Sequence, residues 1–160
     1  MNLFQDVVSF VPNGAILPRQ SGTSERPLRS PDVVPFQSPP SLEKTYTLPN
    51  NGPIAGMAIP SGITTIVGGG FHGKSTLLDA IRLGVWNHIK GDGREYVVTN
   101  PTAVGIRSED GRSVAGVDIS PFIKDLPGGS TTNKWSSNDA SGSTSMAAGV
   151  VEVYSPRVFY

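Results

Sequence analysis

The chain has 160 residues, about the size of one domain, and its 13 basic residues balance its 13 acidic residues, so no net field draws it to nucleic acid or to an anionic membrane. It contains no cysteine, which excludes a disulfide framework and a cysteine-based zinc site, and its two separated histidines do not form a metal site. No apolar run approaches the roughly 20 residues of a membrane helix and residues 1–14 lack the basic start of a secretory signal, so we expect a soluble, intracellular, cytoplasmic protein.

The first part of the chain is rich in residues that favour loops. Residues 20–42 are dense in serine, proline and arginine and end in Ser-Pro-Pro-Ser. This composition predicts an extended connector rather than a packed element. We therefore expect an extended, Pro/Ser-rich N-terminal segment over residues 1–44, a nucleotide-binding core over 45–154 and a divergent tail over 155–160.

The remaining pattern predicts alternating strands and helices. Hydrophobic spacing and turn residues predict a helix over 74–86 and a long polar loop over 128–139. Asp110-Gly111 is a tight-turn signal, which predicts a hairpin between residues 103–107 and 113–117. Further strands are predicted over 45–48, 62–67 and 95–99, and the fold class is α/β.

A glycine-rich stretch lies between the strand predicted over 62–67 and the helix that follows it. From Gly68 to Ser75 the sequence matches the phosphate-binding pattern G-x-x-x-x-G-K-[ST] without a mismatch. A strand before the loop and a helix after it are the context that this pattern requires. The alternative is a glycine-rich turn whose lysine is merely solvated, and the predicted flanking elements make that alternative the weaker one.

Each residue type in this stretch suits a nucleotide triphosphate. Glycines allow successive backbone N–H groups to face phosphate oxygens, and the helix N-terminus adds partial positive charge. Lys74 is predicted to reach the β- and γ-phosphates, and the Ser75 hydroxyl to bind Mg²⁺. The predicted cofactors are ATP and Mg²⁺, and the candidate binding residues are Gly68, Gly69, Gly70, Gly73, Lys74, Ser75 and Thr76.

Several stretches together resemble one known family. The runs at residues 68–78, 84–95, 106–112, 117–123 and 140–145 are similar, in the same order, to the signature stretches of the ATPases of the ABC class. Residues 14–19 and 35–39 are similar to the segment that leads into that family's nucleotide-binding core. The resemblance covers the chain to about Ala148. It implies a partial P-loop NTPase core of the ABC type, with ATP held between one unit's P-loop and a partner's signature segment.

The signature segment implied by this resemblance lies at residues 140–144. Its candidate ligand residues are Ser141, Gly142 and Ser143. Ser141 is a good N-cap and Gly142 allows close backbone approach, so a following helix could face a γ-phosphate. The alternative is an ordinary serine-rich helix cap. The resemblance implies pairing through this segment, with a second copy or with a full-length homologue.

Three weaker candidates have simple structural explanations. Tyr46 stands about where ABC-type folds place an adenine-stacking aromatic residue, but a half-buried strand residue beside Leu48 is the favoured interpretation. His72 could contact phosphate or simply occupy a variable loop position, and we favour the second. The run Gly91-Asp92-Gly93-Arg94-Glu95 is explained by a solvated turn.

The family's later strand, which carries a Mg²⁺-binding carboxylate and a catalytic glutamate, has no counterpart in this sequence. We therefore assign no catalytic residue and expect the chain to bind Mg-ATP without hydrolysing it, as the N-terminal portion of a larger ATPase. One alternative is a non-catalytic nucleotide-binding module that pairs with a full-length homologue. Another is a fragment of an RNA-associated ATPase, which the neutral charge does not support.

Overall fold

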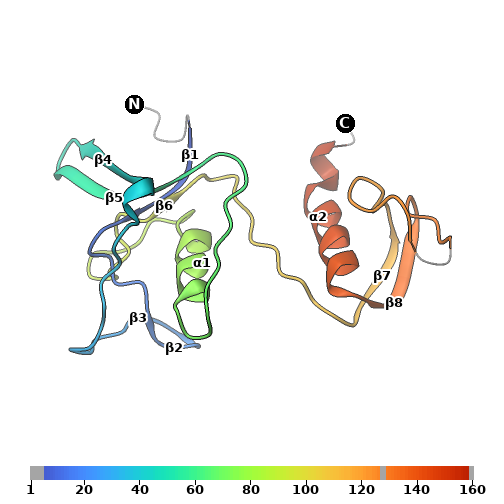
Figure 1. Cartoon of the computed structure of the whole chain (residues 1–160), viewed down its shortest axis with the longest axis horizontal. Helices are drawn as coiled ribbons and strands as arrows, with labels where there is room; N and C mark the ends of the chain where they lie inside the picture. The colour runs from blue at the N-terminus through green and yellow to red at the C-terminus, as the bar shows by residue number, and fades with distance from the viewer. Residues whose placement is uncertain (1–5, 127–128, 159–160) are drawn as a thin grey trace. The chain divides into compact units, whose positions relative to one another are not determined.

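The structure is a computed structural model that describes residues 6–126 and 129–158, with residues 154–158 described by their backbone alone. The chain divides into two compact units, Met1–Val104 and Gly105–Tyr160 (Figure 1). The boundary expected after residue 44 therefore does not coincide with a division between compact units. Each unit has its own hydrophobic cluster.

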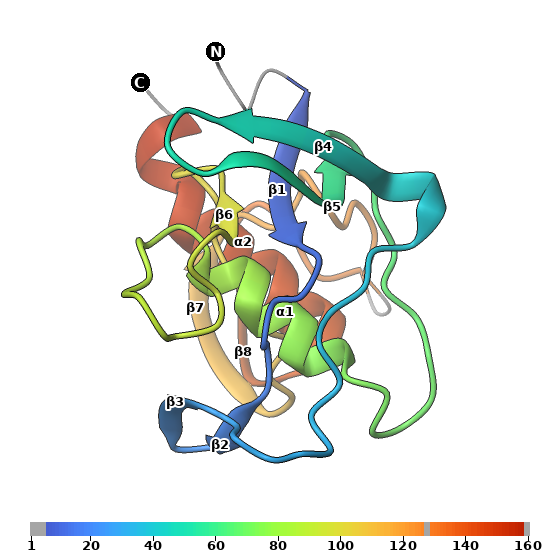
Figure 2. The same cartoon turned by 90° about the vertical axis from the view of Figure 1, so that its left-hand side faces the viewer.

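An antiparallel sheet organises the first unit. It contains β1 (Val7–Pro12), β4 (Glu43–Leu48), β5 (Gly52–Pro60) and the short β6 (Val98–Thr99), in the order β4-β5-β1-β6 (Figure 2). β4 confirms the strand predicted over 45–48. The strand predicted over 95–99 is reduced to two residues.

β1 lies inside this sheet, between β5 and β6. Phe10 and Val11 are buried, because strand β1 is covered on both of its faces. Residues 7–12 therefore belong to the sheet rather than to an extended connector. The rest of the expected connector is mostly loop, with a small hairpin of β2 (Arg19–Ser21) and β3 (Ser24–Pro27) and a 3₁₀ turn at Pro40–Leu42.

The helix predicted after the glycine-rich stretch is α1 (Lys74–Leu83), and Gly84 is its C-cap residue. Ala80 is its buried residue and packs in a cluster with Val11, Met57 and Val97. The buried Thr99 fixes the end of the helix against the sheet, because its backbone N–H donates to the carbonyl oxygen of Gly84 at 2.8 Å. Its hydroxyl donates to the carbonyl oxygen of Ile81 at 2.7 Å.

The strand predicted over 62–67 is wrong. No strand is assigned there, residues 61–70 are exposed, and the preceding strand, β5, ends at Pro60. Ile63 is fully exposed and Val67 is largely exposed. A β-branched run favours an extended backbone, but a strand also needs a hydrogen-bonded neighbour, and the described residues provide none for this run.

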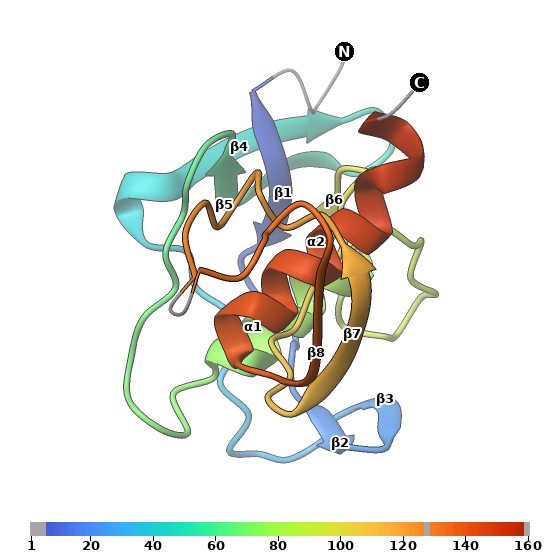
Figure 3. The same ribbon diagram turned by 90° about the vertical axis from the view of Figure 1, so that its right-hand side faces the viewer.

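The second unit is a two-stranded antiparallel sheet packed against one helix, α2 (Gly142–Val158) (Figure 3). The strands are β7 (Arg112–Val117) and β8 (Trp135–Ala140). The predicted hairpin around Asp110-Gly111 is therefore wrong: β7 pairs with β8, in the stretch expected to be a long loop, and residues 103–107 form no strand. Val114, Ile119, Trp135, Ala147 and Ala148 form the core of this unit.

α2 continues into the tail expected to diverge from residue 155, since its backbone is helical to Val158. Residues 159 and 160 of that tail lie outside the described residues. In the two described ranges, neither helix is long and apolar enough to cross a membrane.

Candidate functional site

The glycine-rich loop ends in a left-handed glycine that starts α1. Gly73 is the N-cap residue, with φ of 78°, and its carbonyl oxygen accepts a hydrogen bond from the Leu77 amide at 2.9 Å. Since glycine has no side chain to cap the helix, the first-turn amides, from Lys74 onward, remain available to a ligand. No acidic side chain lies in this first turn, so the positive end of the helix is not neutralised from within.

The seven residues predicted to bind phosphate occupy one continuous, mostly exposed segment. Residues 68–73 and Ser75 are exposed, whereas Lys74 and Thr76 are half-buried. The ammonium group of Lys74 lies back over the loop and donates to the carbonyl oxygen of Gly69. His72 also folds over the loop, because a Cβ on Gly69 would lie 3.1 Å from its ring carbon Cε1. The arrangement is compact and accessible to solvent.

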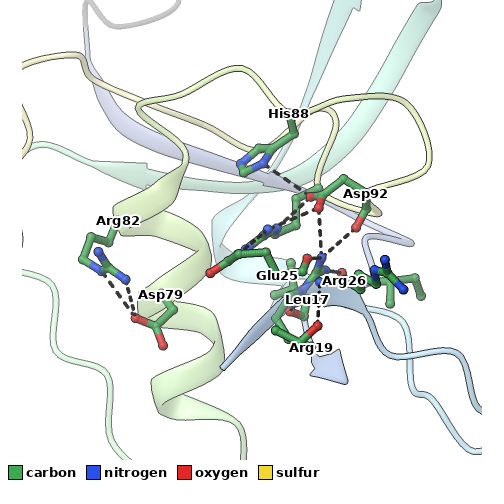
Figure 4. Close-up of polar contacts among 11 residues, drawn as sticks. Leu17, Arg19, Glu25, Arg26, Asp79, Arg82, His88 and Asp92 are labelled. Atoms are coloured by element: carbon green, nitrogen blue, oxygen red, sulfur yellow. Dashed lines mark hydrogen bonds and ion pairs between the residues drawn. The ribbon is translucent and has the colours of Figure 1, made fainter. Parts of the chain in front are cut away.

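A largely buried network of ion pairs holds the loop that follows α1 against the hairpin of β2 and β3. The sequence did not predict this network. Asp92 accepts hydrogen bonds from Nε of Arg94 at 2.8 Å and from Nη1 of Arg19 at 3.0 Å (Figure 4). Nδ1 of His88 lies 3.3 Å from the same carboxylate. Arg94 also donates to Glu25 at 3.0 Å. The run at residues 91–95 is thus an anchor and not a solvated turn.

Burial and charge act in opposite directions on this network. Burial alone would raise the pKa of Asp92, but hydrogen bonds and charge from Arg94, aided by Arg19 and His88, lower it. Burial and the nearby charge of Arg94 lower the pKa of His88 despite the neighbouring carboxylate. Arg94 has its pKa raised, because Asp92 and Glu25 together outweigh the effect of burial. Asp92 and Arg94 are therefore ionised at neutral pH, and the imidazole of His88 is neutral.

The candidate signature segment forms the N-terminal end of α2 in the second unit. Ser141 and Ser143 are exposed, and the Ser145 amide donates to the carbonyl oxygen of Ser141 at 2.8 Å. Ser141 therefore occupies the N-cap position of α2, and its hydroxyl oxygen lies 3.1 Å from that of Thr144.

The surroundings of Gly142 also fit the alternative interpretation, an ordinary helix cap. A Cβ on Gly142 would lie 2.5 Å from the hydroxyl oxygen of Ser108 and 2.8 Å from Oδ1 of Asp110. Glycine is therefore needed for this close approach. The Asp110 carboxylate lies beside the start of α2, where a negative charge interacts favourably with the helix dipole.

The structure separates the predicted residues into two sets. Residues 68–76 are in the first unit and Ser141, Gly142 and Ser143 are in the second.

Tyr46 packs its ring edge-on against Phe10, with centroids 5.2 Å apart, which agrees with its interpretation as a strand residue. Across residues 6–126 and 129–158, no group of three or more His, Cys, Asp or Glu side chains could hold a metal ion.

Comparison with known proteins identifies a family. A family model described as ABC_ATPase, P-loop domain, matches residues 4–158. The uncharacterized protein MJ1628 of Methanocaldococcus jannaschii is 36% identical over 98 residues, which are 60% of this chain and 22% of that relative. The similarity to this relative thus concerns a small part of its length.

Proposed function

Because the chain belongs to the ABC_ATPase family, as a P-loop domain matched over residues 4–158, we propose that it binds Mg-ATP through the loop that precedes α1. The observation that carries this proposal is the end of α1, where a left-handed Gly73 leads into uncapped first-turn amides beside Lys74. Backbone donors and a positive helix end are what a phosphate group requires.

Each residue of the loop has a proposed part in binding. The amides of residues 69–75 surround the β-phosphate, and Thr76 continues the same turn toward the α-phosphate. Lys74, now bonded to the Gly69 carbonyl oxygen, exchanges that neutral partner for phosphate oxygens. A hydrogen bond between charged groups contributes roughly 1.5–3 kcal/mol. The exposed hydroxyl of Ser75 is available as one oxygen ligand of Mg²⁺.

Titration of the purified chain with ATP and Mg²⁺ in a calorimeter tests this function. We expect saturation at one nucleotide per chain. Replacing Ser75 with alanine is expected to remove most of the gain that Mg²⁺ gives while leaving Mg²⁺-free binding nearly unchanged. Failure of the wild-type chain to bind ATP, with or without Mg²⁺, would contradict the proposal.

We further propose that this 160-residue chain holds the nucleotide without hydrolysing it at a measurable rate. Phosphoryl transfer depends on positioning and on charge stabilisation by a metal ion, a carboxylate ligand and a residue that orients water. In α1, the helix that follows the loop, the acidic residue is Asp79. Its Oδ1 forms a surface ion pair with Nη2 of Arg82 at 3.3 Å. This aspartate is about one turn beyond Ser75 on the same helix, so it is not placed like a carboxylate from a neighbouring strand.

The partner is proposed from the second unit. The exposed Ser141 and Ser143 stand at the start of a 17-residue helix, and we propose that they face a nucleotide held by a second copy or by a full-length homologue. Ser143→Glu should abolish ATP-dependent association in analytical ultracentrifugation, since a carboxylate there is compatible with the helix end but repels phosphate. The matched control is Ser113→Glu, because Ser113 is an exposed residue of β7. Association that survives Ser143→Glu would refute this pairing.

A further inference from the structure

A pocket of about 500 Å³ opens beside the glycine-rich loop in the first unit. Its lining comes from two parts of the chain: Phe71, Thr76 and Leu77 belong to the loop and α1, and Val34, Pro35 and Phe36 belong to the segment before β4. We propose that this pocket receives the purine base of the nucleotide whose phosphates the loop binds. The inference rests on the proposed function, because it assigns the base to a place that continues directly from the phosphate site.

The position of the pocket on the helix supports this assignment. Thr76 and Leu77 lie in the first turn of α1, immediately after the residues proposed to hold the phosphates. When the loop binds the β- and γ-phosphates, the sugar and base extend from the α-phosphate away from the loop. The pocket borders the turn where the α-phosphate is expected. Ligand pockets combine apolar walls with a few polar groups, and here the polar groups are at the phosphate end.

Backbone hydrogen bonds to the segment after β1 hold residues 34–36 in place. The Phe36 amide donates to the carbonyl oxygen of Ala15, and the Gly14 amide donates to that of Phe36, both at 2.8 Å. Two residues further on, the buried Ser38 receives support from Asn13, whose Oδ1 accepts from the Ser38 amide at 2.7 Å. Residues 34–36 are therefore pre-positioned, which reduces the ordering cost when a ligand binds.

Phe71 favours a flat aromatic base as the occupant of this pocket. Its ring is fully exposed, and its φ of 60° is uncommon for a residue other than glycine. Val34, which also lines the pocket, is largely exposed as well. A flat aromatic base would cover both side chains at once, and stacking on an aromatic ring tolerates any base because every base has a π-face. Tyr46, by contrast, already packs against Phe10.

Comparing Mg-ATP with inorganic tripolyphosphate separates base binding from phosphate binding. Val34→Trp should fill the pocket, and Phe71→Ala should remove the stacking ring. We expect each variant to lose about tenfold in ATP affinity, or about 1.4 kcal/mol, while tripolyphosphate affinity stays within about twofold of wild type. The matched control is Ile89→Trp, which changes another exposed aliphatic residue of the same unit that does not line this pocket.

The outcomes distinguish this inference from the function on which it rests. Equal affinity of the wild-type chain for ATP and tripolyphosphate would overturn the inference but leave phosphate binding intact. Val34→Trp decides the matter if Phe71→Ala weakens both ligands through the loop backbone. Unchanged ATP binding by Val34→Trp, or selective loss of ATP in Tyr46→Ala alone, would place the base elsewhere. If the wild-type chain binds neither ligand, the proposed function fails, and the inference fails with it.

Discussion

Oδ1 of Asp92 accepts a hydrogen bond from Nη1 of Arg19 at 3.0 Å, across 73 residues of the chain. Both side chains are nearly buried, at 11% and 12% exposed. This contact joins the hairpin of β2 and β3 to the loop that follows α1. It therefore braces the C-terminal side of the helix whose N-terminal end carries the glycine-rich loop.

Asp92→Ala should lower the free energy of unfolding of the chain by about 3 kcal/mol, because Arg19 and Arg94 would lose their shared carboxylate while still largely buried. The matched control is Asp79→Ala. Asp79 is 61% exposed and pairs with Arg82 on the surface, so its removal should cost less than about 1 kcal/mol. Urea unfolding curves give both values, and equal losses would show that the network does not stabilise the unit.

Acidification should destabilise the chain through His88. Because the pKa of His88 in the folded state is lowered from its ordinary 6.5, the unfolded chain takes up a proton first as the pH falls. This histidine's contribution to stability is therefore present above that value and decreases as the pH falls below it. The lowered pKa of Asp92 acts in the same direction at still lower pH.

His88→Asn isolates this effect, because the amide can still donate to Asp92 but does not titrate. Nε2 of His88 is buried and has no hydrogen-bond partner among the described residues, so protonation would leave an N–H group without an acceptor. Unfolding free energies at pH 7.5 and 5.5 should fall less in the variant than in wild type. An equal fall in both would exclude His88 as the source.

The sheet requires glycine at residue 56. A Cβ there would lie 2.4 Å from the Val11 carbonyl oxygen and 2.7 Å from Cζ of Phe10. Gly56→Ala should therefore destabilise the first unit by roughly 1–3 kcal/mol. The new methyl group would meet backbone atoms of β1, which cannot shift without disturbing the pairing of the two strands. Gly22→Ala is the control, since nothing lies within 4 Å of the place that its new methyl group would take and its φ is ordinary. Similar melting temperatures for the two variants would argue against the register of β1 and β5.

Local patterns predicted some elements well. The glycine before Lys74 and the apolar spacing of Leu77 and Ile81 predicted α1 to within three residues of its end, because caps and helical periodicity are encoded locally. Strand pairing was predicted less well. Trp135–Ala140 has four polar residues between its two apolar ends, so its sequence indicates a loop, and only its pairing with β7 makes it a strand.

The candidate site shows the same division. The phosphate-binding pattern is a continuous stretch and can be read from the sequence, but the strand predicted before it over residues 62–67 is absent, and its role in binding stays a prediction. The ion network joins two parts of the chain, Arg19 and Glu25 with His88, Asp92 and Arg94, through contacts across 73 and 69 residues, and no local pattern predicts that these charges meet. A glycine on each side of Asp92 was the available signal: Gly93 has a φ of 83° and approaches Ile16 closely.

The chain should release no phosphate from ATP above the level of its own Lys74→Ala variant. Binding supplies positioning, but the charge stabilisation and oriented water of phosphoryl transfer need further groups. A coupled phosphate-release assay over several hours, with both proteins at equal concentration, measures the difference. Release that depends on Lys74 would mean that this chain carries a complete catalytic set.

Binding of Mg-ATP to the wild-type chain and to Lys74→Ala, followed by calorimetry, tests the central claim most directly. Lys90→Ala, which removes an exposed lysine of the same unit, serves as the matched control. We predict saturable binding by the wild type and by Lys90→Ala, and a loss of at least about tenfold in affinity in Lys74→Ala. Equal binding by all three proteins would contradict the assignment of the loop before α1 as the nucleotide site.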